Sequence, residues 1–181
     1  NKPFLRLSSF SEGLAEVGKI KTFLLFPTSV KYGFVNKNME FEIEPVYNAV
    51  GNFSDGLAAF SQKSKMGYIN TDGEVAIPNK YLFAYEFSEG LARVKLDNAF
   101  GFIDKSGKMV IENKYQAAGD FQCVLARIYK NQKWGYVNKS GEEIIYPQFN
   151  FADNFHKGLA RVSVDGKTQI INTDGIVIWP K

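Results

Sequence analysis

Short segments in which apolar and polar residues alternate follow one another along the whole chain. In LARVKL at 91–96, Ala92 and Val94 lie on one side of an extended chain, whereas Arg93 and Lys95 lie on the other. Segments rich in aromatic and β-branched residues, such as FGFID and WGYVN, come shortly afterwards. Because such residues favour strands and the period of the alternation is two, the pattern predicts β-strands throughout.

The strand pattern repeats with a period of 34 residues. A glycine that follows an aromatic residue, or Met66 in one copy, recurs at Gly33, Gly67, Gly101 and Gly135. A second landmark recurs as FSEGLAEV at 10, FSDGLAAF at 53, FSEGLARV at 87, FQCVLARI at 121 and FHKGLARV at 155. Its first two copies are 53 − 10 = 43 residues apart, so the first unit has about nine extra residues, which we place within GKIKTFLLFPTSV. Landmarks that share one period indicate a tandem repeat of five units.

Each unit is expected to contain three antiparallel strands. The second and third strands are joined by a turn in which an Asx residue stands three positions before glycine, as in Asn70/Gly73, Asp104/Gly107, Asn138/Gly141 and Asn172/Gly175. An Asx side chain can bond the turn backbone, and glycine accepts the positive φ that closes the hairpin. The first unit has Asn36 but Met39 in place of the glycine, so we expect an altered turn there.

The end of each unit predicts a break in the sheet. The third strand is expected to stop at Pro78 or Pro147, because proline cannot donate to a ladder. In the following YLFAYEF segment, Tyr81, Ala84 and Phe87 are spaced by three. That spacing favours a single 3₁₀ turn that packs its apolar side on the sheet.

The repeated glycine inside the second strand indicates close packing. Glycine within a strand marks a bulge or a place where another group approaches the backbone. We expect an aromatic ring of the adjacent strand or unit to lie over Gly33, Gly67, Gly101 and Gly135. The alternative is that these glycines only relieve the local twist of the strand.

Together these motifs resemble the WG repeat family, also written KWG. The combined pattern F-S-E-G-L-A-x-V followed by K-W-G-Y-[IV]-[ND]-x-x-G covers essentially the whole chain in five copies. The resemblance implies a mostly bacterial, β-rich module and implies no reaction, cofactor or catalytic residue. Two copies depart from the pattern, with Gln122, Cys123 and Val124 in place of Ser-Glu-Gly and Thr168-Gln169 in place of the aromatic-Gly pair. The departures therefore leave the strand entry at 122–124 and the packing at 168–169 open.

The expected fold is all-β, a tandem array of five antiparallel units of about 34 residues over 1–181. Residues 1–9 match the end of a preceding unit, and the units follow at 10–52, 53–86, 87–120, 121–154 and 155–181. Three strands are few for a propeller blade, which typically has four. The sequence therefore favours an open twisted stack, with a five-bladed propeller-like ring as the alternative.

Composition narrows the classes of function. The net charge of +3 is too small to indicate nucleic acid, and no apolar run approaches the roughly 18 residues of a membrane span. One cysteine excludes an internal disulfide and a thiolate zinc cluster, but it does not indicate a cellular compartment. We therefore predict neither nucleic-acid binding nor membrane insertion.

Candidate chemistry is sparse. The single histidine, His156, lies where other units have serine, and Cys123 has no histidine motif beside it. Each turn supplies one Asx residue rather than an acidic cluster, which favours a structural turn over a calcium site. The acids Glu12, Asp55 and Glu89 recur one unit apart and so form no close carboxylate pair. We predict no catalytic residue, no metal site, no cofactor and no enzymatic activity.

Binding features are more evident. Arg93, Arg127 and Arg161 share one strand position in three consecutive units and would form a column on one face. The column could bind carboxylates or phosphates of a partner, or it could pair with neighbouring acids such as Glu89 and Asp120. Trp134 is a further candidate for partner binding through an exposed ring. We expect a non-catalytic scaffold that binds a protein partner, with a carbohydrate or cell-envelope binding module as the alternative.

Overall fold

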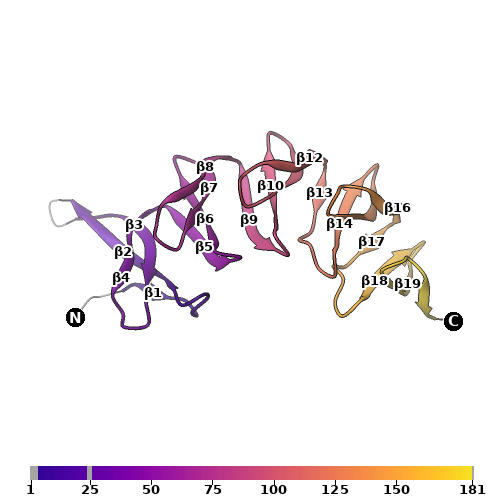
Figure 1. Cartoon of the computed structure of the whole chain (residues 1–181), viewed down its shortest axis with the longest axis horizontal. Helices are drawn as coiled ribbons and strands as arrows, with labels where there is room; N and C mark the ends of the chain where they lie inside the picture. The colour runs from indigo at the N-terminus through magenta and orange to yellow at the C-terminus, as the bar shows by residue number, and fades with distance from the viewer. Residues whose placement is uncertain (1–3, 24–25, 181) are drawn as a thin grey trace. The chain divides into compact units, whose positions relative to one another are not determined.

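The computed structural model describes residues 4–23 and 26–180, and the elements in these ranges are β-strands (Figure 1). The chain forms two compact units, Asn1–Glu86 and Phe87–Lys181. The boundary between them falls within strand β9, Phe83–Ser88.

The strands form five four-stranded antiparallel sheets, each made of four consecutive strands that are hydrogen-bonded in chain order. Sheet 1 contains β1 (Arg6–Leu7), β2 (Ala15–Phe23), β3 (Phe26–Val35) and β4 (Phe41–Tyr47). Sheet 2 contains β5 (Ala49–Ser54), β6 (Leu57–Gln62), β7 (Lys65–Asn70) and β8 (Val75–Tyr81). Sheet 3 contains β9, β10 (Leu91–Leu96), β11 (Ala99–Ile103) and β12 (Met109–Tyr115).

The last two sheets repeat this order. Sheet 4 contains β13 (Ala117–Ala118), β14 (Leu125–Lys130), β15 (Lys133–Asn138) and β16 (Glu143–Phe149). Sheet 5 contains β17 (Phe151–Ala152), β18 (Leu159–Val164), β19 (Lys167–Asn172) and β20 (Val177–Trp179). Within the described residues none of the five sheets closes on itself. The predicted all-β tandem array of five antiparallel units is therefore confirmed.

Each sheet has four strands, so the prediction of three was wrong. The segment read as a 3₁₀ turn is strand β9, in which Ala84 and Phe87 are buried. The equivalent strand β5 gives the reason for the spacing of three. Its pairing with β6 shifts by one residue between Val50 and Phe53, and a bulge of this kind returns residues three apart to the same face.

The last strand of the sheet does not end at proline as the sequence predicted. Strands β8 and β16 continue past Pro78 and Pro147. In sheet 4 the pairing shifts between Trp134↔Phe149 and Tyr136↔Ile145, which leaves a bulge around Pro147. Because a bulged residue makes no ladder bond, proline is tolerated there.

The same bulge explains the repeated glycine. A Cβ at Gly135 would lie 2.5 Å from the carbonyl oxygen of Ile145 and 2.6 Å from the nitrogen of Pro147. The backbone of the fourth strand of the sheet approaches Gly33, Gly67 and Gly101 in the same way. Close packing over the glycines is thus confirmed, but the expected aromatic ring was wrong, because the neighbouring group is main chain.

The Asx turns form as predicted. Asn138 Oδ1 accepts hydrogen bonds from the N–H groups of Ser140 (3.1 Å) and Glu142 (3.0 Å), and Gly141 has φ of +87°. The first unit does not differ, contrary to expectation. Asn36 accepts the equivalent bonds from the N–H groups of Asn38 and Glu40, and Met39 adopts φ of +61°. The two side-chain bonds hold the turn although the glycine is missing.

The extra residues of the first unit lengthen one hairpin. Strands β2 and β3 have nine and ten residues, whereas β6 and β7 have six each. This confirms the predicted location of the insertion, of which residues 24–25 lie outside the described part of the chain.

The cores within each compact unit lie between consecutive sheets. We call the face of a sheet on which the next sheet packs its forward face, and the opposite face its backward face. Between sheets 4 and 5, the core consists of Leu125, Tyr136, Ile145 and Phe149 on the forward face and Ala152, Phe155, Ala160, Val162 and Ile171 on the backward face. Equivalent cores lie between sheets 3 and 4 and between sheets 1 and 2. Each sheet in these pairs therefore buries its apolar residues only with a neighbour.

Candidate functional site

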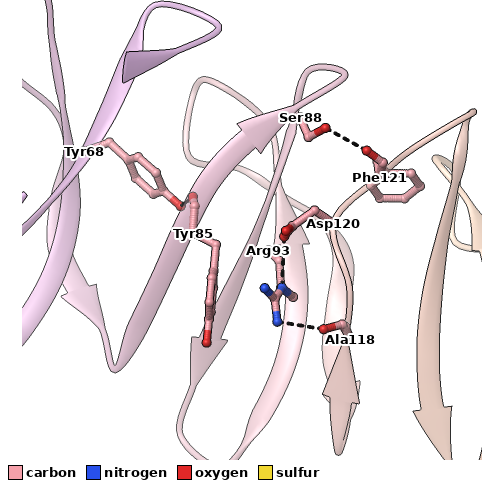
Figure 2. A network of polar contacts seen from close by, with 7 residues as sticks. All are labelled: Tyr68, Tyr85, Ser88, Arg93, Ala118, Asp120 and Phe121. Atoms are coloured by element: carbon pink, nitrogen blue, oxygen red, sulfur yellow. Dashed lines mark hydrogen bonds and ion pairs between the residues drawn. The ribbon is translucent and has the colours of Figure 1, made fainter. Parts of the chain in front are cut away.

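The first predicted binding residue, Arg93, is held by neighbouring polar groups (Figure 2). Its Nε lies 3.1 Å from Asp120 Oδ1, and its Nη1 donates to the carbonyl oxygen of Ala118 at 2.7 Å. The side chain is only 14% exposed. The predicted pairing with Asp120 is confirmed, whereas Glu89 pairs instead with Lys139 at 3.3 Å.

Arg127 occupies the same position in the next sheet and makes the same type of contact. Its Nη1 donates to the carbonyl oxygen of Ala152 at 2.5 Å. Its guanidinium lies over the ring of Trp134, with 4.9 Å between Cζ and the ring centroid. Arg127 therefore links the forward face of sheet 4 to a main-chain carbonyl of sheet 5.

Arg161 has a different environment. Its Nε pairs with Asp153 of its own sheet at 2.9 Å, and its side chain is 58% exposed. Its guanidinium lies 5.3 Å from the ring centroid of Phe151. Of the three predicted arginines, this one is mostly accessible to solvent. Partner binding by the arginine column stays a prediction.

Trp134 is not a freely exposed ring. It is partly buried between the guanidinium of Arg127 and the ring of Tyr129, whose centroid is 5.0 Å away. Two other aromatic residues are far more exposed, Tyr146 at 72% and Trp179 at 58%. The sequence analysis did not single out Tyr146. Its alternation with Ile145, which is buried in the core, could have identified it.

An apolar row on the edge strands was also missed. Val110, Ile144 and Ile178 are spaced by 34 residues on β12, β16 and β20, each of which is the last strand of its sheet. Their side chains are 38%, 45% and 39% exposed. We call these three residues and Tyr146 the edge-strand row.

The recurring FSEG motif joins consecutive sheets. Ser88 Oγ donates to the carbonyl oxygen of Phe121 at 2.7 Å (Figure 2), and Glu89 Oε2 accepts from the N–H of Val124 at 3.0 Å. Ser11 and Glu12 make the equivalent bonds to the main chain of sheet 2. Glu12 and Glu89 therefore serve as acceptors for the main chain of the following sheet.

In the fourth unit, Gln122, Cys123 and Val124 replace Ser-Glu-Gly, yet the tight hairpin that precedes β14 still forms. Cys123 and Val124 adopt φ of +54° and +62°, close to the +54° and +86° of Glu89 and Gly90. The N–H of Gly158 approaches Cys123 Sγ at 3.4 Å, where other units supply a carboxylate. The tight turn therefore fixes the path of the backbone in the fourth unit despite the three substitutions.

The fifth unit also keeps its pairing at the variant positions. Gln169, which replaces the glycine, pairs with Val162. Strand β20 ends at Trp179, which pairs with Ile170 as Ile145 pairs with Tyr136.

The surroundings of Tyr136 and Asp104 shift the pKa of each side chain in a known direction. Tyr136 donates its hydroxyl to the carbonyl oxygen of Asp153 at 2.7 Å, and burial raises the pKa of Tyr136 well above its usual value. In the turn of sheet 3, the Ser106 hydroxyl and nearby N–H groups lower the pKa of Asp104. Both groups stabilise local structure.

The residues considered for chemistry lie apart. His156 is exposed in the hairpin that precedes β18. Within residues 4–23 and 26–180, no three His, Cys, Asp or Glu side chains are placed to hold a metal ion. The described part of the chain contains no helix long and apolar enough to cross a membrane.

Solved structures share the fold at low sequence identity. Hsv2p of Kluyveromyces lactis superposes with a TM-score of 0.56 at 10% identity over 97% of this chain and 62% of that one. A structure of the same organism's Hsv2 with complete loop 6CD gives a TM-score of 0.53 at 12% identity over 98% of this chain and 62% of that one. The chain thus spans less than two thirds of the length of these structures.

Sequence comparison gives a more specific result. A search of curated proteins yields no match. The family model of the WG containing repeat matches four times, at residues 32–65, 66–98, 100–134 and 134–167. These matches cover most of the chain and coincide with the 34-residue period of the sheets. The chain therefore belongs to the WG containing repeat family.

Proposed function

We propose that the chain is a non-catalytic scaffold that binds a protein partner along the edge-strand row of Phe87–Lys181. The observation that carries the proposal is the exposure of Val110, Ile144 and Ile178 at one repeated position. Each of the three sheets thus exposes an apolar side chain at the same place, and exposed apolar surface often marks interaction sites. The outer edges of β12 and β16 also bear main-chain groups that an extended partner segment could pair with.

The chemistry of the row favours a protein over a small molecule. Along β16, Ile144 and Tyr146 alternate with the buried Ile145, so these two side chains stand on one side of the strand. A repeated strand offers contacts at regular spacing rather than one enclosed cavity. Such a surface suits a partner that contributes apolar side chains of its own.

A photo-crosslinking experiment tests this proposal. A photoreactive residue replaces the exposed Gln148 on β16, and proteins captured by the intact chain are compared with those captured by an Ile144→Asp/Tyr146→Ser variant. We expect the double variant to lose the captured partner. Lys167→Ala, an exposed position on β19, is the matched control and should retain it. Equal capture by all three proteins would contradict the proposal.

A carbohydrate ligand is the second candidate, favoured by the exposure of Tyr146 and Trp179. Exposed rings can stack on the apolar faces of sugars. Because the chain has two tryptophans, Trp134→Phe leaves Trp179 as the only reporter. A saturable change in its fluorescence on titration with cell-wall glycan supports this function. An unchanged spectrum at high glycan concentration contradicts it.

A further inference from the structure

A hollow of about 330 Å³ lies between sheets 1 and 2, within the compact unit Asn1–Glu86. It is bordered by the FSEG hairpin at 10–13, the beginning of β4 and the Asx turn of sheet 2. The residues that line it are Glu12, Gly13, Leu14, Glu42, Thr71 and Asp72. Three of these six side chains are carboxylates, and Leu14, which is 7% exposed, adds an apolar wall. We call this feature the acidic hollow.

The junction between sheets 3 and 4 is built in the same way. The turn glycine of sheet 2, Gly73, packs on Ile43 of sheet 1, with 3.3 Å between a Cβ built on the glycine and Ile43 Cγ1. The turn glycine of sheet 4, Gly141, packs on Ile111 of sheet 3 with an equivalent distance of 3.4 Å. Residues at equivalent places in the two junctions can therefore be compared directly.

A lysine of the chain itself occupies this place between sheets 3 and 4. Lys139 Nζ lies 3.3 Å from Oε2 of Glu89, which is the equivalent of Glu12. Lys139 stands two residues before the turn glycine, and the residue at that position in sheet 2 is Thr71. The recurring carboxylate of the FSEG hairpin thus takes a primary ammonium group in one junction, whereas Thr71 cannot supply one in the other.

The acidic hollow also has carboxylates where the other junction has uncharged side chains. Glu42 is equivalent to Val110, since each precedes the isoleucine that pairs with a phenylalanine of the third strand. Asp72 is equivalent to Ser140 of the sheet 4 turn. The lining of the acidic hollow therefore carries three negative charges, whereas Glu89 and Lys139 cancel. Carboxylates gathered in this way favour a cation among them.

The arrangement of the carboxylates favours an ammonium group over a metal ion. Within residues 4–23 and 26–180, no three His, Cys, Asp or Glu side chains are close enough to hold a metal. A lysine ammonium has three donors on a flexible four-carbon stem, so it can bond carboxylates that stand apart. Its stem can lie along the apolar wall that Leu14 provides.

The acidic surface continues from the hollow along strand β4. Glu42 and Glu44 are both exposed and alternate with the buried Ile43, so they stand on one side of the strand. Two residues of a strand span roughly 6.6 Å, and alternate side chains of any extended polypeptide recur at that same interval. Opposite charges that face each other across neighbouring strands stabilise the pair. The spacing therefore suits an extended polypeptide with lysines two positions apart.

We propose that the acidic hollow binds a lysine side chain of a basic polypeptide partner, presented in an extended Lys-x-Lys segment. The first ammonium group contacts Glu12, Glu42 and Asp72, at the place that Lys139 occupies between sheets 3 and 4. The second faces Glu44. This site uses residues of Asn1–Glu86 and the edge-strand row uses residues of Phe87–Lys181, so either proposal can fail without the other.

The test is a nuclear magnetic resonance titration of the full ¹⁵N-labelled chain with the capped peptide Gly-Ser-Lys-Gly-Lys-Ser-Gly. We expect saturable shifts of the amide resonances of Gly13, Gly56 and Asp72, because these residues line the hollow or donate to Glu12. The same peptide with both lysine side chains acetylated keeps the stems and lacks the charges. It should cause no such shifts.

Matched variants separate a built site from general attraction between opposite charges. Glu42→Gln should weaken binding about ten-fold, because the lost charge lines the hollow. Glu112→Gln removes an equally exposed charge from β12 and should leave the affinity unchanged. Thr71→Lys should abolish peptide binding, because the introduced ammonium group reaches Glu12 as Lys139 reaches Glu89.

The reverse exchange transfers the site to the other junction. The triple variant Lys139→Thr/Val110→Glu/Ser140→Asp places the lining of the acidic hollow between sheets 3 and 4. It should gain a peptide-dependent shift at the amide of Val124, which donates to Glu89. The unmodified chain should show no shift at Val124.

Four results would overturn the proposal. The first is the absence of saturable shifts at millimolar peptide, and the second is equal binding of the acetylated peptide. The third is an equal loss of affinity in Glu42→Gln and Glu112→Gln, which would reveal attraction without a site. The fourth is tighter binding of spermidine than of the peptide at the same resonances, which would assign the hollow to free amines.

Discussion

Sheets 4 and 5 carry the same arginine in two different environments. Arg127 donates to the main chain of sheet 5 and covers Trp134, whereas Arg161 pairs with Asp153 and remains 58% exposed. The sequence around both residues is Leu-Ala-Arg. The comparison teaches that the role of a repeated residue is set by the sheet that follows it. Equivalent substitutions in the two sheets should therefore have unequal effects.

The largest difference is expected at the repeated glycine position, which lies in the third strand of each sheet. Gly135→Val places a branched side chain where a Cβ alone would lie 2.5 Å from the Ile145 carbonyl oxygen. Because that neighbour is backbone and cannot rotate away, we expect the free energy of unfolding to fall by about 3 kcal/mol. Gln169→Val, the equivalent change in sheet 5, should be nearly neutral. Urea unfolding of both variants checks the prediction, and equal losses would contradict it.

The arginines should give the next largest difference. Arg127→Ala removes a charged donor from a main-chain acceptor and uncovers Trp134, so we expect a loss of about 2 kcal/mol. Arg161→Ala breaks an exposed pair and should cost less than about 1 kcal/mol. Thermal and urea unfolding measure both. A greater loss for Arg161→Ala would show that the covering sheet does not determine the role of the residue.

The hairpins that precede β14 and β18 offer a stabilising change. Val124 is a β-branched residue with φ of +62°, whereas the equivalent Gly158 has φ of +79°. A left-handed conformation costs an L-residue roughly 1–2 kcal/mol, so Val124→Gly should raise stability by about 1 kcal/mol. Gly158→Val should lower it by a similar amount. Finding that Val124→Gly destabilises the chain would mean that the exposed valine side chain has a role of its own.

The smallest effect concerns pH. The folded-state pKa of Asp104 lies below its ordinary value of 3.8, mainly because the Ser106 hydroxyl donates to the carboxylate. A depressed pKa contributes stability above the unfolded value, and this contribution is lost as pH falls through the folded value. Asp104→Asn replaces the titrating carboxylate with the amide found in sheets 4 and 5. The free energy of unfolding of this variant should therefore fall slightly less than that of the unmodified chain as the pH drops below 3.8. Urea unfolding between pH 6 and pH 2.5 compares the two proteins, with Asp165→Asn, in the β18–β19 hairpin, as a control outside the Asx turns.

The features that local chemistry determines were predictable. Period, strand alternation and the Asx turns follow from residue types that act within a few positions, as Asn138 and Gly141 illustrate. The fourth strand was not predictable in this way. The bulge in β5 and its equivalents changes the side-chain period from two to three, which mimics a helical turn.

The candidate site was less predictable because it depends on acceptors from other sheets. The acceptor of Arg127 is a carbonyl oxygen that every residue possesses, so no side chain in the sequence identifies it. The group that packs over Gly135 is likewise main chain, so no side chain in the sequence identifies it. Conversely, Tyr146 and the edge-strand row could have been found from their alternation with buried isoleucines. An alternation pattern indicates which side chains share a face, but it does not indicate which faces are covered.

The bonds that Ser88, Glu89, Arg127 and Tyr136 make to the following sheet all end on main-chain atoms. A gene duplication that inserts one more unit would therefore supply matching acceptors and donors at once, without a compensating mutation in its neighbours. Substitutions in one unit are likewise insulated from the next, as Cys123 in place of an acid illustrates. Arrays built in this way can change length and surface sequence independently, which makes copy number a variable that evolution can adjust freely.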